Sequence, residues 1–243
     1  MKIEPRRENG ITVRFLAQTI LNDTVFPDSL GISEFVDSLN NNHNVGKDLF
    51  ANLKYYFFLH LEDFGIDDKS EIDIIFWNEK VILPIEVKAF TDANSPDVKK
   101  EIIRNYFHID ALKNKSRFDF NQQQEIYPIL LYSESYQKWK RGKNKDHDYF
   151  DSRFLLTKGK EQSNKLDDWG SGGYPIPEKY YQRSDFTDMV KEINRKLFFT
   201  TWEKVYQIHL KLNNANVFSK KIEEFRLLKD TFQSSNGISL INL

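Results

Sequence analysis

The sequence predicts a mixed α/β domain in which helices flank a central β-sheet, with additional helices at both ends of the chain. Three stretches favour this class. Residues 70–90 read as a hairpin of two strands, residues 95–113 have helical spacing, and residues 125–133 read as a further strand. The expected order around the sheet is helix, strands, helix, strand, strand, helix.

The length of 243 residues suits one domain with a substantial core. Hydrophobic residues make up 40% and charged residues 29%, as in ordinary soluble proteins. We expect a single domain over residues 1–243. Its parts are a helical extension over 1–44, a catalytic core over 45–135, a basic and Gly-rich connection over 136–180, and a strand with helices over 181–243.

The charge balance and the residue types exclude several classes. With 35 basic and 36 acidic side chains, the bulk signature of a nucleic-acid binder is missing, although basic residues can still gather on one groove. The absence of cysteine excludes disulfides, thiolate zinc sites and cysteine nucleophiles. No signal-type or membrane-length apolar stretch is present, so we expect a cytoplasmic protein without membrane contact.

Three helices are expected before the hairpin. Apolar spacing predicts them over residues 12–22, 29–39 and 46–63, with a polar loop at 40–44 between the second and the third. The third helix rests on four residues at four-residue spacing: Leu49, Leu53, Phe57 and Leu61.

The hairpin carries ionisable residues on apolar strands. Alternation of side chains groups Glu71 and Asp73 on one face of the first strand, and Glu86 and Lys88 on one face of the second. Burying a charge without a partner costs several kcal/mol, and a bound metal ion is one compensation. The alternative is an amphipathic hairpin whose charges are solvated, or paired as Asp73 or Glu86 with Lys88.

The register decides which carboxylates meet. If the turn is centred on Asn78 and Glu79, Glu71 lies across from Glu86, and Asp73 lies diagonally at roughly 7–8 Å. Carboxylates at this spacing can reach one cation. A slip by one residue would send Asp73 and Glu86 to opposite faces.

An acid in a β-rich run, a short turn, and then acid, apolar residue and lysine in a second run together resemble the PD-(D/E)XK nuclease superfamily, which has the restriction-endonuclease-like fold. Residues 71–75 and 85–89 look most like the hairpins of Holliday-junction-resolvase-like and related small nucleases. The resemblance implies a hydrolase: a metal-dependent endonuclease that cleaves phosphodiester bonds in DNA, with a role in restriction-modification or defence drawn from the family.

The same resemblance implies roles for particular residues. Asp73 and Glu86 would hold one or two Mg²⁺ (or Mn²⁺) ions, with the backbone carbonyl of Val87 as a further ligand. The cation would activate water and stabilise charge on the phosphate, while Lys88 orients the water or neutralises developing charge.

The third metal ligand stays open. The helix before the hairpin often supplies an acid in this family, and Asp48 is the nearest match. The usual glutamate one turn further on is not present, because residues 50–52 are Phe, Ala and Asn. Glu71, Asp48 or Glu34 could supply the ligand.

After the hairpin, Ser95 can cap a helix with Pro96 at its first position. Lys100, Arg104 and His108 recur at four-residue spacing on one face, which is either a nucleic-acid contact or a solvated face. In the resemblance this helix often places side chains near the site, and its candidates here are Glu101, Arg104 and Tyr106.

A basic cluster with an aromatic residue follows, which could neutralise phosphates and stack on an unpaired base; a solvated loop is the alternative. Its nucleic-acid-binding candidates are Lys138, Trp139, Lys140, Arg141 and Lys143. The acidic and histidine residues at 146–148 read as a charged loop.

The remaining chain completes the core. Residues 157–177 are a connection without the pattern of a phosphate-binding loop, so no nucleotide cofactor is evident. Residues 197–201 predict a last strand followed by a helix over 202–212. An amphipathic stretch at 217–232 closes the core or forms a dimer contact.

Two other functions compete with the nuclease. One is a catalytically silent nucleic-acid-binding module, and the other is an accessory subunit of a larger nuclease complex. The choice between DNA and RNA, the structure or sequence recognised, and a homodimer as opposed to a monomer are not decided by these patterns.

Overall fold

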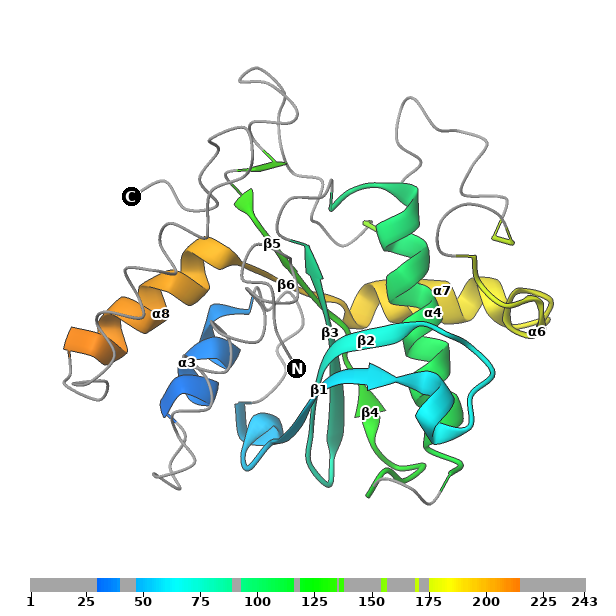
Figure 1. The fold of residues 1–243 in the computed structure, drawn as a ribbon, viewed down its shortest axis with the longest axis horizontal. Helices are drawn as coiled ribbons and strands as arrows, with labels where there is room; N and C mark the ends of the chain where they lie inside the picture. The colour runs from blue at the N-terminus through cyan, green and yellow to red at the C-terminus, as the bar shows by residue number, and fades with distance from the viewer. Residues whose placement is uncertain are drawn as a thin grey trace.

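A computed structural model describes residues 30–39, 47–88, 93–115, 119–134, 136–137, 154–156, 169–170 and 175–214. Within these residues the chain forms one mixed, open sheet of six strands with helices on both of its faces (Figure 1). The strand order is β1-β2-β3-β5-β6, and β4 pairs with β3. The α/β class predicted from the sequence is confirmed.

The strands are β1 (Lys54–His60), β2 (Glu71–Trp77), β3 (Val81–Lys88), β4 (Glu125–Ile126), β5 (Ile129–Tyr132) and β6 (Phe198–Thr201). The described helices are α3 (Leu30–Ser38), α4 (Pro96–Leu112), α6 (Glu178–Tyr181), α7 (Phe186–Lys196) and α8 (Trp202–Asn214), with 3₁₀ turns η3 (Lys47–Phe50) and η4 (Leu61–Phe64).

The centre of the sheet is β3, and all of its eight residues are buried. It pairs antiparallel with β2 on one side and parallel with β4 and β5 on the other. Helices cover both of its faces, which explains the nearly continuous apolar sequence. The predicted hairpin is therefore confirmed as the centre of the fold.

The turn of the hairpin differs from the prediction by one residue. The backbone N–H of Asn78 donates to the carbonyl of Val81 at 3.0 Å, so Glu79 and Lys80 form the turn instead of Asn78 and Glu79. The side chain of Asn78 accounts for the shift, because its oxygen accepts from the N–H groups of Lys80 and Val81 at 2.8 and 2.9 Å. An Asn side chain that bonds the backbone two residues on is a recognised turn former.

The helix predicted over residues 46–63 is wrong. The chain forms η3, then β1, then η4, which ends at Gly65 with φ of 73°. Six residue pairs join β1 to β2, and the aromatic run of β1 suits a strand. Hydrogen bonds to β2, which follows in sequence, outweigh the helical spacing of the leucines.

The predicted start of α4 is confirmed. Oγ of Ser95 accepts from the N–H of Val98 at 3.3 Å, and Pro96 occupies the first helical position. The helix extends for 17 residues and connects β3 to the parallel strands β4 and β5.

The later strands are confirmed, and the short helix α6 and the longer helix α7 are added. The predicted strand at 125–133 appears as β4 and β5, interrupted at Pro128, and β6 and α8 lie where the sequence placed them. Helix α7 was not predicted. It lies between β5 and β6, which are parallel and so need a crossover connection.

Two apolar layers enclose the sheet (Figure 1). On one face, α3 and α8 pack through Phe35 and Trp202 against side chains such as Phe76 of β2. On the other, α4, α6 and α7 pack against the opposite side of the same strands. The hairpin thus receives α4 on one face only, and this face carries Glu86.

Several predicted segments lie outside the described residues. They are the helices at 12–22 and 217–232, the basic cluster at 138–145, the charged loop at 146–148 and most of the connection at 157–177. None of the helices in the described part of the chain combines the length and apolar character needed to span a bilayer.

Candidate active site

A fork opens where β2 and β3 part. Their register ends at the pair Ile74–Ile85. Beyond it β2 stays with β1 as far as Glu71, while β3 stays with β5 as far as Lys88. In Figure 1, β1 and β2 accordingly turn across the molecule while β3 continues beside β5. We call this opening the fork; Asp73, Glu86, Val87 and Lys88 border it.

The register places Asp73, and not Glu71, across from Glu86. Because Ile74 pairs with Ile85, the next positions along the two strands are Asp73 and Glu86. The predicted pairing of Glu71 with Glu86 is wrong, since the turn lies one residue further along the chain. The predicted parity holds, and both carboxylates lie on the face that α4 covers.

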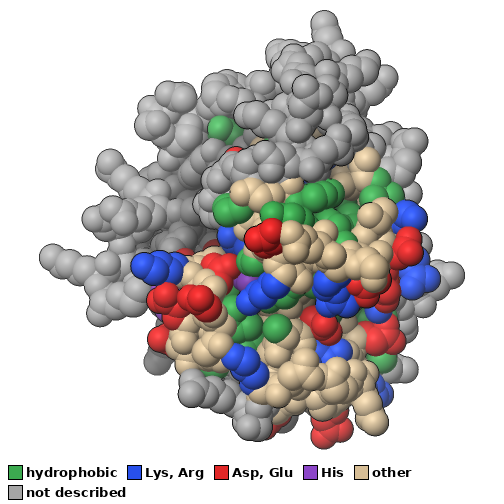
Figure 2. Space-filling model, turned by 90° about the vertical axis from the view of Figure 1, so that its right-hand side faces the viewer, with side chains coloured by type: hydrophobic (Ala, Val, Ile, Leu, Met, Phe, Trp, Pro, Cys, Tyr) green, Lys and Arg blue, Asp and Glu red, His purple; other side chains and the backbone are tan. Residues whose placement is uncertain are grey.

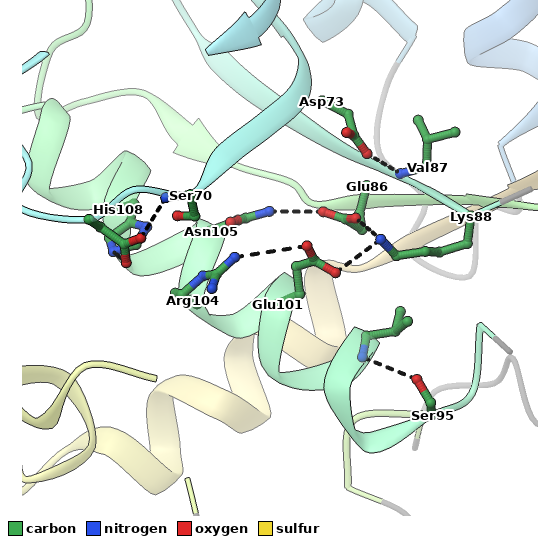
Figure 3. Close-up of polar contacts among 12 residues, drawn as sticks. Ser70, Asp73, Glu86, Val87, Lys88, Ser95, Glu101, Arg104, Asn105 and His108 are labelled. Atoms are coloured by element: carbon green, nitrogen blue, oxygen red, sulfur yellow. Dashed lines mark hydrogen bonds and ion pairs between the residues drawn. The ribbon is translucent and has the colours of Figure 1, made fainter. Parts of the chain in front are cut away.

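The carboxylate of Asp73 replaces a backbone acceptor. In a regular ladder the N–H of Val87 would donate to the carbonyl of Ile72, but it donates to Oδ2 of Asp73 at 2.8 Å (Figure 3). Alternation along β3 directs the carbonyl of Val87 to the same side, toward the fork. The fork thus brings together oxygen atoms from Asp73, Glu86 and Val87.

Glu86 is buried, with 4% of the residue exposed. Its Oε2 accepts from Nδ2 of Asn105 on α4 at 3.0 Å, and its Oε1 lies 2.5 Å from Nζ of Lys88. Figure 3 shows this carboxylate between the two partners. Both oxygens therefore have polar partners, as burial of a charge requires.

Glu101 of α4 joins the site from the helix side. Its Oε2 lies 3.0 Å from Nζ of Lys88, and its Oε1 lies 3.8 Å from Nη2 of Arg104. Burial and the negative charge of Glu86 raise the pKa of Glu101 to about 8, against the opposing effects of Lys88 and Arg104. Glu86, Lys88, Glu101 and Arg104 thus form one buried network of two acids and two bases. The half-buried Asp73 borders it at the fork.

The network is unlike a dedicated metal cage. Within the described residues, no group of three or more His, Asp or Glu side chains could hold a metal ion by itself. The oxygen set at the fork consists of two carboxylates and one backbone carbonyl. Such hard oxygen donors in small number fit Mg²⁺, which keeps several of its waters.

Two of the three candidates for a third acidic ligand, Glu71 and Glu34, have ion-pair partners in the structure. Glu71 pairs with His60 across β1, at 3.5 Å between Oε2 and Nδ1. Glu34 of α3 forms an ion pair with Lys211 of α8, on the other face of the sheet. Glu34 therefore lies on the face of the sheet opposite to Glu86.

Asp48 lies at the wrong end of the hairpin. It belongs to η3, where the neighbouring carbonyl of Leu49 accepts from the side chain of Asn78 at 2.7 Å. Glu86 lies five positions along β3 from Val81, which is beside that turn, and five steps of a strand correspond to about 16 Å. An aspartate side chain does not span this distance.

The expected solvated face of α4 is wrong. Lys100, Arg104 and His108 are all buried, with 1%, 4% and 0% of each residue exposed. Nucleic-acid contacts of Lys100 and Arg104 stay predictions, and their burial means that a phosphate would have to enter the site to meet them. The other nucleic-acid-binding candidates, Lys138, Trp139, Lys140, Arg141 and Lys143, lie outside the described residues.

His108 continues the polar face of α4 toward β2. Its Nε2 lies 3.2 Å from Oδ2 of Asp68, whose Oδ1 accepts from the N–H of Ser70 at 2.8 Å. Burial lowers the pKa of His108 in spite of this carboxylate. Burial tends to raise the pKa of Asp68, but the hydrogen bonds from His108 and Ser70 outweigh it and hold the pKa well below its usual range. The pair fastens the start of β2 to α4.

The structure places Asn105, which was not predicted, beside Glu86. Tyr106, which was predicted near the site, lies elsewhere. Asn105 was missed because an amide carries no charge, although its spacing of four residues from Glu101 places both on one side of the helix. Tyr106 is buried elsewhere: burial and the charges of Glu192, Asp110 and Glu125 raise its pKa.

Two cavities are lined by described residues, and the larger one does not lie at the fork. A hollow of about 380 Å³ lies at the turn of the hairpin, beside Lys54, Trp77 and Asp119. Beside Glu86, between Pro84 and Pro128, water-sized space is only about 10 Å³, enough for at most one water molecule. We take the charged network as the candidate site, because the residues that line the larger hollow form no comparable set of buried charged groups.

Charged side chains of both signs are mixed on the visible face. Figure 2 views the molecule from the right-hand side of Figure 1 and shows acidic and basic groups interspersed over the described residues. This agrees with the net charge of −1.

Comparison with family models, curated proteins and solved structures found no match to the chain.

Proposed function

We propose that the protein is a metal-dependent endonuclease that hydrolyses phosphodiester bonds in DNA. The observation that carries this proposal is the convergence of Asp73, Glu86 and Lys88 at the fork. If β2 and β3 stayed paired, their backbone groups would bond to each other. Because the two strands part, the carboxylate of Asp73 and the carbonyl of Val87 both face the fork.

The order of elements supports a restriction-endonuclease-like core. Antiparallel strands β1, β2 and β3 lead into the crossover helix α4, and β5 then pairs parallel with β3. This arrangement puts the acid of β2, the E-x-K run of β3 and the helix after it side by side, as the resemblance to PD-(D/E)XK nucleases implies. A role in restriction or defence belongs to this proposal.

The site residues divide the work. Asp73, Glu86 and the carbonyl of Val87 would hold Mg²⁺ or Mn²⁺, which supplies Lewis-acid activation of water and phosphate when bound. Lys88 presents an ammonium group at the same opening, where it orients the attacking water or neutralises charge on the phosphate. Burial strengthens each of these interactions relative to water.

A second function is favoured by one observation. Both oxygens of Glu86 already have protein partners, Lys88 and Asn105. A carboxylate satisfied in this way needs no cation, as expected for a catalytically silent nucleic-acid-binding module or an accessory subunit on the same fold. The mixed surface charge fits an accessory role better than strong independent binding to DNA.

Cleavage assays decide between the two functions. The purified protein is incubated with plasmid and branched DNA in Mg²⁺, Mn²⁺ or EDTA, beside Asp73→Asn and Lys88→Met variants. We expect metal-dependent cutting that falls about 100-fold or more in either variant, because each loses a charge at the reacting phosphate. The exposed Asp188→Asn variant is the control and should cut normally. Metal-independent binding without cutting would establish the silent module instead.

A further inference from the structure

Helix α4 contacts both members of the Glu86–Lys88 pair. Glu101 and Asn105 lie four residues apart and so share one side of the helix. Asn105 donates to Oε2 of Glu86 at 3.0 Å, and Oε2 of Glu101 lies 3.0 Å from Nζ of Lys88. The helix therefore supports the carboxylate with one side chain and the ammonium with the other.

The two acidic partners of Lys88 are not equivalent. Oε1 of Glu86 lies 2.5 Å from Nζ. Oε2 of Glu101 is close enough for an ion pair, yet it is buried and accepts no aligned hydrogen bond from any described residue. Oε2 of Glu101 thus lies within ion-pair distance of an ammonium group that is closer to Glu86.

The proposed cation would compete with this arrangement. A divalent cation and an ammonium group on the same carboxylate repel each other, so cation binding weakens the bond from Lys88 to Glu86. Lys88 is buried, and a buried charge that loses its partner costs several kcal/mol. A second carboxylate at 3.0 Å from Nζ can then keep Lys88 charged and in place.

We propose that Glu101 is a positioning residue for Lys88. When a divalent cation binds at the fork, the ammonium group of Lys88 transfers from the carboxylate of Glu86 to that of Glu101. The inference rests on the proposed nuclease function and adds to it the residue that keeps the ammonium group in place. Arg104, 3.8 Å from the other oxygen of Glu101, holds the carboxylate toward the site from the same helix.

The charge on Glu101 supports the transfer. The negative charge of Glu86 is the second cause, after burial, of the raised pKa of Glu101. A cation bound to Glu86 cancels this second cause and lowers the pKa again.

A double-mutant cycle tests the transfer without relying on cleavage. Urea unfolding is measured by circular dichroism for the wild type, Lys88→Met, Glu101→Gln and the double variant, in EDTA and in saturating Mg²⁺. Contacting charged residues are coupled in such cycles. We expect the coupling factor in the unfolding equilibrium constant to be about tenfold larger in Mg²⁺ than in EDTA.

The possible failures are distinguishable. If Mg²⁺ stabilises the wild type but the coupling factor is the same in both buffers, the positioning role is overturned and the metal site stands. If Mg²⁺ leaves wild-type stability unchanged, the metal site fails and the proposed function fails with it. If Glu101→Gln raises the Mg²⁺ concentration needed for stabilisation, Glu101 is a ligand and the inference is wrong.

Two further measurements separate positioning from folding. In cleavage assays Glu101→Gln should lower the rate about tenfold while the Mg²⁺ concentration for half-maximal rate is unchanged, and the exposed Glu178→Gln should change neither. Glu101→Asp keeps the charge and should recover part of the lost coupling with Lys88. The inference would be contradicted if Glu101→Asp lost as much of the cleavage rate as Glu101→Gln and recovered none of the coupling with Lys88.

Discussion

Asp73 combines a structural contact with a proposed catalytic one. Its Oδ2 accepts from the N–H of Val87 at 2.8 Å. In a regular ladder the carbonyl of Ile72 would accept from this N–H, but β2 and β3 part before that pair. The same side chain carries negative charge toward Glu86. The two contributions can be separated, because an amide retains the accepting oxygen and loses the charge.

The Asp73 variants should therefore differ in stability but not in activity. We expect Asp73→Ala to be about 1–2 kcal/mol less stable than Asp73→Asn, since alanine leaves the N–H of Val87 without its acceptor. Urea unfolding measures this difference. Both variants should lose cleavage. Equal stability of the two would show that the hydrogen bond to Val87 contributes nothing measurable.

Glu101 makes stability depend on pH in an unusual direction. The pKa of its carboxyl rises from 4.5 to about 8 on folding, so between these values the folded state binds more protons than the unfolded state. Its contribution is complete below pH 4.5 and is lost as the pH rises through 8. The charged groups facing it are Glu86 and Lys88 from β3 and Arg104 from its own helix.

Replacing Glu101 removes this pH dependence. In EDTA, we expect the stability of Glu101→Gln relative to the wild type to increase from pH 5 to pH 8.5, by on the order of 2 kcal/mol. Urea unfolding at a series of pH values checks the trend. Glu178→Gln, at an exposed position of α6, is the matched control. A trend of opposite sign for Glu101→Gln would refute the raised pKa.

At the scale of the element, β1 shows how a pairing partner overrides local spacing. The leucines and Phe57 recur at helical intervals, yet Lys54–His60 forms six pairs with β2. The run is also rich in aromatic residues, which favour strands. Helix α4 shows the opposite case, because Ser95 and Pro96 mark its start in sequence and the start is where they predict.

Substitutions at Tyr56 test whether residues 54–60 form a strand or a helix. Tyr56 is 41% exposed in β1 and its ring contacts that of Phe64. Threonine and alanine both lose this contact, so the difference between the two variants reports backbone preference. In a strand, Tyr56→Thr should be about 0.5 kcal/mol more stable than Tyr56→Ala. A helix would reverse the order, since alanine is the better helix former. Thermal unfolding of the two variants measures the difference.

At the scale of the whole molecule, segments far apart in sequence share one core. Trp202 at the start of α8 is 0% exposed and lies in the same apolar cluster as Phe35 of α3 and Phe76 of β2. β6 also pairs with β5. The residues after 196 therefore support the sheet that carries the site, although they lie more than a hundred residues from Glu86 in sequence.

Removing Trp202 should weaken the whole domain. We expect Trp202→Ala to cost about 3–5 kcal/mol, because it leaves a large cavity between α8 and the sheet. Denaturant unfolding monitored by circular dichroism measures this loss, and the exposed Gln207→Ala on the same helix should change stability by less than about 0.5 kcal/mol. A small effect of Trp202→Ala would mean that α8 does not belong to the cooperative unit.

Local patterns alone determined the hairpin, its parity, the start of α4 and the last strand with its helix. Each depends on neighbours within a few residues: alternation along a strand, an Asn turn, a Ser-Pro cap. Asp73, Glu86 and Lys88 could be named for the same reason, because their shared face follows from a period of two.

Only the tertiary structure decided which groups meet them. The register, set by the turn at Glu79 and Lys80, replaced Glu71 with Asp73 opposite Glu86. The crossover of α4 brought Glu101 and Asn105 to the fork and buried side chains expected in solvent. Such contacts join residues 13 or more positions apart, and local spacing does not encode how a helix rotates against a sheet when both are packed.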